Sequence, residues 1–407
     1  MTELKRSIGF SMLTLYGLGT ILGAGIYVLV GKVAITAGIY APISFLIAAL
    51  LAGVSGYSYA KLSALFPKSA GEAVYIQEAF NRQTLSTVIG WMVVLTGIVS
   101  AATISKGFVG YLQVFVSIPD FWAITLLLIT MTALAAWGVS ESVMVTAVTT
   151  VMGIVGLGII LIYSLPAFTT LPDRIHELTP SFNDGAIWYG ILLGAFLAFY
   201  AFIGFEDMVN MAEEVKQPQR SLPKAIIAAI VISSLLYYFI ALAAVLQLPI
   251  EELTASKAPM ADIMQRHSEP MAWFISLISL AAVVNGALVQ IIMGARVLYG
   301  MGKQGLAPLW LATLHPSRKT PLLATVLLGA VVWFLATNLD LTNLAKITSF
   351  IIIVVFLLVN SALITLYYRG QTGAIKVWMP ALGVLMCLVF LCLQIVQMVT
   401  SGAPIAH

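Results

Sequence analysis

The chain has 407 residues, of which 60% are hydrophobic and only 9% are charged, and its formal net charge is +3. Soluble domains have roughly 45–50% apolar and about 25% charged residues, so this composition excludes a soluble enzyme. One membrane helix needs about 20 apolar residues, so the length allows about ten to twelve membrane helices and no large extramembrane domain.

Apolar runs bounded by charged residues, Pro and Gly predict about eleven membrane helices. In chain order the predicted spans are 8–32, 41–66, 85–117, 120–138, 142–166, 186–212, 223–248, 269–302, 321–338, 343–368 and 376–400. The first apolar stretch is too long for a secretory signal, and ten more follow it, so we expect an uncleaved first span. Residues 1–407 are thus predicted to form one all-α integral membrane domain.

The basic residues predict an orientation in the membrane. With a cytoplasmic N-terminus, fourteen of the twenty Lys and Arg residues fall in cytoplasmic connections and four in the opposite loops, while Lys106 and Lys346 lie within predicted spans. Basic loops are retained in the cytoplasm. We therefore expect a multi-pass protein of the cytoplasmic (inner) membrane, with its N-terminus inside and its C-terminus outside.

The first span contains the densest glycine cluster, with Gly17, Gly19, Gly23 and Gly25 in the stretch GLGTILGAGIY. Each Gly costs a helix interior roughly 0.5–1 kcal/mol relative to Ala, so the cluster predicts a break near mid-membrane. Backbone groups freed in hydrocarbon must line a cavity or meet a ligand. The N–H groups of Ala24 and Gly25 would suit a carboxylate. The alternative is close helix packing through a GxxxG face.

The sixth span has a second candidate break in FYAFIGFEDM, residues 199–208, where Gly204 interrupts aromatic residues and Glu206 follows. A carboxylate inside a span is costly and usually functional. The alternative for Glu206 is an acid at the cytoplasmic end of the helix, because Asp207 and further acids come soon after. With one break in each half, 8–166 and 186–368 can form two inverted five-helix repeats, and 376–400 is an additional helix.

Two sequence blocks together resemble the amino acid–polyamine–organocation superfamily of transporters. They are GLGTILGAGIY in the first span and GFEDMVNMAEEVKQPQRSLPKAI at 204–226, and PKSAGEAVY at 67–75 and GARVLYGMGKQGLAP at 294–308 support them. The resemblance covers residues 8–400. It implies ten core helices in two inverted repeats, with substrate held between the broken first and sixth helices.

The resemblance also implies positions for the substrate groups. The substrate carboxylate would meet the N–H groups of Ala24 and Gly25 after Gly23, and the ammonium would meet the carbonyls of Ile21, Tyr200, Ala201 and Ile203 near Gly204. Tyr200 stands where the family often places an aromatic that closes over substrate. Glu206 stands where some members have an acid tied to proton sensing or to the inward gate.

Opposed half-helix ends offer N–H groups on one side and C=O groups on the other, which matches a zwitterion. The expected substrate is therefore an amino acid, and a neutral one because the site as predicted has no basic residue. A polyamine or other organic amine stays an alternative, since the same fold can recognise a substrate through its ammonium alone. The predicted function is a symporter or exchanger that works by alternating access in the lipid bilayer.

The coupling ion stays open between a proton and sodium, with ion-free exchange as a third mode. Proton-coupled relatives resemble one another in a fifth-helix lysine, and Gly153 stands at that position here. The middle of the eighth span, 280–293, has no Ser or Thr and offers only Asn285 and Gln290 for a sodium ion. Lys106 lies about eleven residues from the outer end of its predicted span, where it either snorkels outward or replaces the missing lysine.

Other function classes lack their usual signals. The four histidines lie in loops or at the terminus, no HExxH or GxSxG motif is present, and we expect no metal, no cofactor and no enzymatic activity. The basic residues form no patch for nucleic acid. A channel is a remote alternative, because a pore would need lining charges or carbonyl rings repeated by symmetry.

Overall fold

The computed structural model describes residues 6, 8–23, 25–68, 71–137, 142–303, 305–315 and 320–402. Within these ranges the chain is almost entirely helical, and the only β-type contact is an isolated bridge between Ile8 and Val215. The long unbroken helices are α3 (Ala41–Leu65), α5 (Gln83–Leu112), α6 (Asp120–Trp137), α7 (Ser142–Tyr163), α11 (Pro218–Gln247), α14 (Glu269–Lys303), α15 (Leu322–Asn338), α16 (Leu341–Tyr368) and α17 (Trp378–Gly402).

Two predicted spans are interrupted. The first consists of α1 (Phe10–Ile21) and α2 (Gly25–Ala37), and the sixth consists of α10 (Gly185–Ala198) and the 3₁₀ segments η2 (Phe199–Phe202) and η3 (Glu206–Glu214). Short elements connect the spans: η1 (Gly38–Tyr40), α4 (Gly71–Phe80), α8 (Leu165–Phe168), α9 (Leu171–Leu178), α12 (Ile250–Ala255), α13 (Pro259–Gln265) and η4 (Leu309–Ala312). The predicted all-α membrane fold with broken first and sixth helices is therefore confirmed.

Nine stretches of the described chain are long and apolar enough to cross a membrane. The first stretch, Phe10–Leu65, is 56 residues long, more than twice the length that one crossing needs, and it includes the broken first helix and α3. The apolar helix α15 is shorter than these stretches. The number of eleven spans stays a prediction.

Three predicted span boundaries differ from the helices by five residues: α2 ends at Ala37 and not at 32, α11 begins at Pro218 and not at 223, and α5 ends early. The third span was expected to reach residue 117, but α5 ends at Leu112 and the chain then turns through Gln113 and Val114. Lys106 is therefore six residues from the end of its helix. This shorter distance to the helix end favours outward snorkelling of its ammonium.

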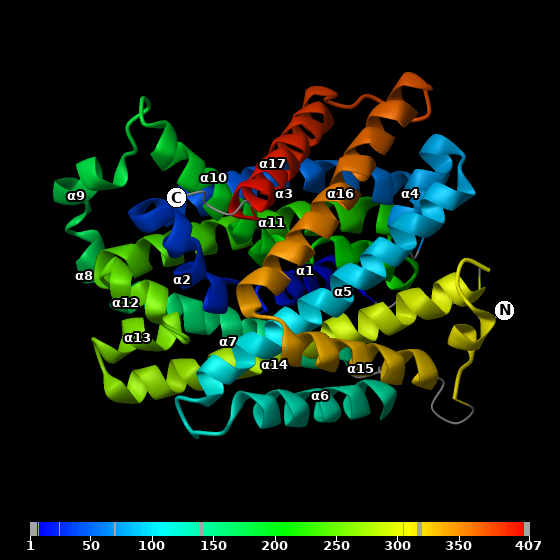
Figure 1. The fold of residues 1–407 in the computed structure, drawn as a ribbon. Helices are drawn as coiled ribbons and strands as arrows, with labels where there is room; N and C mark the ends of the chain where they lie inside the picture. The colour runs from blue at the N-terminus through cyan, green and yellow to red at the C-terminus, as the bar shows by residue number, and fades with distance from the viewer. Residues whose placement is uncertain are drawn as a thin grey trace.

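The broken helices lie at the centre of the bundle (Figure 1). Helix α1 packs against α7, α11 and α14, while α2 and the following α3 pack against α10. Helices α6 and α15 lie side by side at one edge, and α17 packs against α16 and α3 at another. Short helices α8, α9, α12 and α13 gather at one end of the bundle, and α4 lies at the opposite end (Figure 1).

Large apolar side chains face outward on the edge helices, as expected where lipid replaces water. On α6 they include Leu126 and Ile129, which expose 67% and 64% of their surface, and on α15 they include Phe334 with 59%. The segments around the breaks are instead buried, with Phe199, Phe202 and Phe205 fully enclosed. The interior is therefore organised around the two breaks.

Candidate functional site

The first break is where the glycine cluster predicts it. Helix α1 ends at Ile21, the N–H of Leu22 closes the last turn on the carbonyl of Leu18 at 2.7 Å, and α2 begins at Gly25. Ala24, which the resemblance places at the substrate carboxylate, lies outside the described residues. A Cβ at Gly23 would lie 3.5 Å from the Cα of Gly286 on α14, so this side of the break is close to the eighth span.

The second break is centred on Gly204. After η2, the backbone of Ile203 is extended, and Gly204 has a φ of +126°, a conformation that essentially only glycine adopts. A Cβ at this position would lie 2.7 Å from the backbone carbonyl carbon and oxygen of Thr20. Gly204 is therefore required both by its backbone conformation and by the close approach of the first span.

The two breaks contact each other directly. The hydroxyl of Thr20 donates to the carbonyl of Gly204 at 2.8 Å and also lies 2.9 Å from the carbonyl of Gly17. A Cβ at Gly25 would lie 2.4 Å from the Cα of Ala201, so the start of α2 rests on η2. The two explanations for the glycine cluster are thus compatible, because glycines around the break also allow close packing.

A residue that the sequence did not single out joins the two breaks. The hydroxyl of Tyr237, on α11, lies 2.7 Å from the carbonyl oxygen of Ile21 and 2.9 Å from that of Ala201, and the side chain is fully buried. These are two of the carbonyls that the resemblance assigns to the substrate ammonium. The only signal for Tyr237 in the sequence is a polar-tipped aromatic in an apolar helix, which needs a buried partner.

Tyr200 lies between η2 and the third span. Its hydroxyl is 3.2 Å from the hydroxyl oxygen of Ser100 on α5 and 3.2 Å from the carbonyl oxygen of Ser100, and 4% of Tyr200 is exposed. Its own carbonyl accepts a hydrogen bond from the N–H of Ile203 at 3.2 Å, and Ile203 is also buried. Sequence reasoning could not name a third-span residue near the site, and the structure identifies Ser100.

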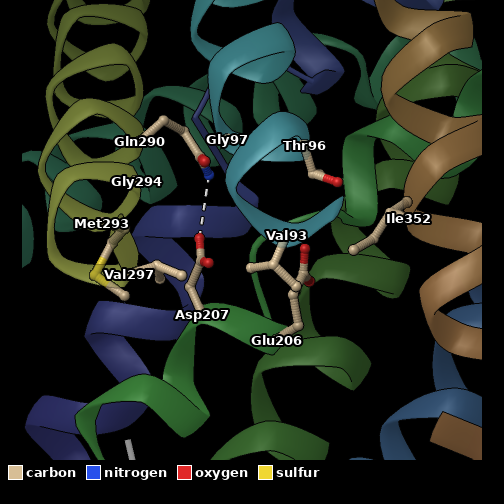
Figure 2. Close-up of a pocket in the computed structure, with 10 residues that line it drawn as sticks. All are labelled: Val93, Thr96, Gly97, Glu206, Asp207, Gln290, Met293, Gly294, Val297 and Ile352. Atoms are coloured by element: carbon tan, nitrogen blue, oxygen red, sulfur yellow. Dashed lines mark hydrogen bonds between the residues drawn. The ribbon is translucent and has the colours of Figure 1, made fainter. Parts of the chain in front are cut away.

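Two acids at the start of η3 face a small cavity (Figure 2). One oxygen of Glu206 accepts from the N–H of Gly204 at 2.8 Å, and one oxygen of Asp207 accepts from the side-chain amide of Gln290 at 3.1 Å. Glu206 and Asp207 are 3% and 7% exposed. The remaining lining residues come from α5, α14 and α16: Val93, Thr96, Gly97, Met293, Gly294, Val297 and Ile352. Glu206 is therefore a buried acid that stabilises the break. An acid at an exposed helix end, the alternative from the sequence, would not be enclosed in this way.

A tyrosine hydroxyl bonds to Gly153, the residue that the resemblance aligns with the fifth-helix lysine of proton-coupled relatives. Tyr27 of α2 donates to the carbonyl of Gly153 at 2.9 Å, and Tyr111 of α5 donates to the carbonyl of Tyr27 at 2.6 Å. Gly153 of α7 therefore contacts the second half of the broken first span. Two buried tyrosines, which the sequence did not indicate, link the third, first and fifth spans there.

The other two candidate coupling residues are separate from this chain of tyrosines. Asn285 of α14 is buried, and its side-chain oxygen accepts from the hydroxyl of Thr146 on α7 at 3.4 Å. Lys106 is half-buried, and none of the ion pairs seen among the described residues involves it. Its position near the end of α5 favours snorkelling over a replacement for the missing lysine.

Comparison with known proteins identifies the family of this chain, and that family agrees with the membrane fold described above. A family model described as amino acid permease matches residues 8–405. The branched-chain amino acid permease BcaP of Bacillus subtilis (strain 168) is similar, with 30% identity over 392 residues, 89% of this chain and 81% of that protein. The methylthioribose transporter of the same organism is 28% identical over 387 residues, 89% of this chain and 82% of that protein.

A plant relative is similar as well. The mitochondrial cationic amino acid transporter 3 of Arabidopsis thaliana is 28% identical over 393 residues, 90% of this chain and 63% of that protein. The family match extends over both broken spans and nearly the whole chain. This chain is therefore an amino acid permease of the amino acid–polyamine–organocation superfamily, a membrane transporter and not an enzyme.

Proposed function

We propose that this permease is a secondary active transporter that moves neutral amino acids across the cytoplasmic membrane by alternating access. The observation that carries the proposal is the meeting of two helix breaks whose carbonyls, those of Ile21 and Ala201, converge on one hydroxyl. Carbonyls that share a donor in this way are arranged for an ammonium, which has three N–H groups to offer. The start of α2 has free N–H groups and the positive end of the helix dipole, which favour the carboxylate of the substrate.

A neutral side chain on the substrate is favoured by the groups around the breaks. Apart from Glu206, which accepts from the N–H of Gly204, the side chains that bind there are uncharged: Thr20, Ser100, Tyr200 and Tyr237. The relative named for branched-chain amino acids agrees with this preference. We assign the carboxylate to the backbone from Gly23 to Gly25, the ammonium to Ile21, Tyr200, Ala201 and Ile203, and the hinge of the sixth span to Gly204.

An organic amine or a cationic amino acid is the second candidate. Glu206 and Asp207 lie in one cavity next to the sixth-span break, and two buried acids there would suit a second positive charge on the substrate. A relative named as a cationic amino acid transporter fits this alternative. A channel has no comparable observation in its favour.

For coupling, we propose that Glu206 holds the sixth-span break closed through its bond to Gly204, and that Asn285 and the Tyr27–Gly153 pair hold the first and fifth spans in register. Lys106 is assigned to the membrane surface. We further propose that residues 8–166 and 186–368 are inverted repeats, and that α4 lies on the cytoplasmic side, where the basic loops belong.

Uptake into proteoliposomes tests the substrate class. We expect labelled neutral amino acids to be taken up, with competition by other neutral amino acids and no competition by their methyl esters, because esterification removes the carboxylate. Runs with pH, sodium or substrate gradients identify symport or exchange. Competition by the esters and by polyamines, equal to that by amino acids, would instead support an amine transporter.

Tyr200→Phe is expected to weaken substrate retention modestly. The variant keeps the ring but loses the hydroxyl contacts to Ser100, worth about 0.5–1.5 kcal/mol, so KM should rise about two- to tenfold with kcat less affected. Tyr163→Phe is a matched control, because Tyr163 is an exposed tyrosine at the end of α7. An unchanged KM for Tyr200→Phe would remove its hydroxyl from the site.

A further inference from the structure

Helix α4, in the connection between the second and third spans, buries a carboxylate. Its inward face includes Gly71, Glu72 and Tyr75, and Glu72 exposes only 2% of its surface. Glu78, on the same helix, is exposed. A surface connection of ten helical residues would not need an acid on its buried face, so Glu72 calls for an explanation.

The surroundings of Glu72 are aromatic. Tyr59 of α3 has its ring centroid 6.4 Å from that of Tyr75, 5.5 Å from that of Phe205 and 5.2 Å from that of Phe356 on α16. The hydroxyls of Tyr59 and Tyr75 and one oxygen of Glu72 are buried, and no hydrogen bond of normal geometry reaches any of them within the described chain. Three buried polar atoms without a hydrogen bond of normal geometry mark a place where a proton or a water molecule would be stabilised.

The charged groups that face Glu72 are acidic. Asp207 and Glu206 approach from η3, and the charge of Asp207 acts on Glu72 directly. Helices α5 and α16, which pack against α4, carry Lys106 and Lys346 near their far ends.

Two cations near this end of the bundle have other partners. Lys61 of α3 lies over the ring of Tyr57, with its ammonium 5.6 Å from the centroid, and Arg296 of α14 lies 3.8 Å from Glu214. Buried acids without a cation are strongly disfavoured in their ionised form, so this cluster must hold protons. Burial and, to a smaller extent, the charge of Asp207 raise the pKa of Glu72 to about 7, although a backbone hydrogen bond and the nearby Tyr59 hydroxyl lower it.

We propose that Glu72 is a proton-binding residue of the gate on the α4 side of the transporter, protonated when η3 packs on α4 and deprotonated when they separate. This proposal rests on the alternating-access cycle proposed above. The contact between the two elements is tight, since a Cβ at Gly71 would lie 2.7 Å from a methyl carbon of Val209 on η3. Opening this contact admits water to the carboxylate.

The direction of the pH effect follows from the two environments. In the open gate, Glu72 is hydrated and its pKa returns toward the ordinary value of about 4.3. Because the pKa is higher in the closed gate, protonation favours closure, and this preference is complete below about pH 4.3 and lost as the pH rises through about 7. Alkaline conditions on the α4 side should therefore open the gate.

A reporter cysteine measures the gate without any substrate. Val209 is fully buried at the contact with α4, so Val209→Cys places a reporter thiol there. The two native cysteines are removed by the substitutions Cys387→Ala and Cys392→Ser. Maleimide labelling of this parent in proteoliposomes is followed over a pH series from about 5 to 8 on the α4 side, and each rate is divided by that of the denatured protein. The corrected rate should rise at least about tenfold with pH.

Glu72→Gln should remain at the low-pH rate throughout, because the amide mimics the protonated acid, and Glu78→Gln should keep the rise of the parent. Tyr59→Phe keeps the ring and removes the hydroxyl that lowers the pKa, so the midpoint should move to higher pH. A rise in Glu72→Gln equal to that of the parent would overturn the proposal. If Glu72→Gln fails to fold, an unmoved midpoint in Tyr59→Phe overturns it equally.

The outcome is distinguishable from failure of the proposed function. Labelling that depends on Glu72 in a protein that transports no amino acid supports the proton gate and overturns the substrate assignment. Amino acid uptake combined with labelling that ignores Glu72 supports the substrate assignment and overturns the proton gate.

Discussion

Gly204→Ala is expected to abolish transport and to lower the yield of folded protein. The φ of +126° strains any residue with a side chain, at a cost of about 1–3 kcal/mol. The added methyl group would also meet the backbone of Thr20 at 2.7 Å, and overpacking of this kind costs about 1–3 kcal/mol more. Relief by movement would break the bonds from Thr20 to Gly204 and from Gly204 to Glu206, which join the first and sixth spans.

Three measurements check this prediction: the amount of monodisperse protein, the thermal unfolding temperature and uptake in proteoliposomes. Gly158→Ala is the control, because Gly158 is a glycine of α7 with open space where the Cβ would lie. We expect the control to keep wild-type uptake and Gly204→Ala to lose at least about thirtyfold, the equivalent of about 2 kcal/mol. Wild-type uptake by Gly204→Ala would contradict the requirement for glycine at this break of the sixth span.

The positions of the two breaks could be predicted because their cause is local. Glycines lower helix stability wherever they stand, so the cluster around Gly23 and the lone Gly204 among aromatics mark the breaks in the sequence itself. The same reasoning found Glu206, since an acid within an apolar stretch is conspicuous. The alignment of Gly153 with the fifth-helix lysine came from the resemblance and stays a prediction, while the sequence did not indicate the bond from Tyr27 to its carbonyl.

The partners of the breaks could not be predicted, because they depend on how distant helices pack. Tyr237 lies 216 residues from Ile21 in the chain, and Ser100 lies 100 residues from Tyr200. Helices surrounded by lipid and by other helices are apolar on every face, so hydrophobic periodicity gives no direction for a side chain. Glu72 could not be predicted for a related reason, because an acid in a polar connection is expected to be exposed unless the packing of α4 is known.

Tyr237→Phe is expected to tighten apparent substrate affinity while slowing net uptake. In the substrate-free protein the hydroxyl is within hydrogen-bond distance of the carbonyls of Ile21 and Ala201. Its loss leaves these carbonyls without this donor, at a cost of about 1–3 kcal/mol. A bound ammonium would donate to the same carbonyls, so the substrate-bound protein loses less. Apparent affinity should therefore increase roughly tenfold.

The return of the empty carrier passes through the state that Tyr237 stabilises, so net uptake should slow more than exchange between substrate on both sides. Tyr238→Phe is the control, since Tyr238 is the next residue of α11 and is half-buried against other groups. Binding titrations, net uptake and exchange on the same preparations separate the two effects. Weaker binding in Tyr237→Phe would mean that the hydroxyl binds the substrate together with these carbonyls, because a hydroxyl that the ammonium displaces can only compete with it.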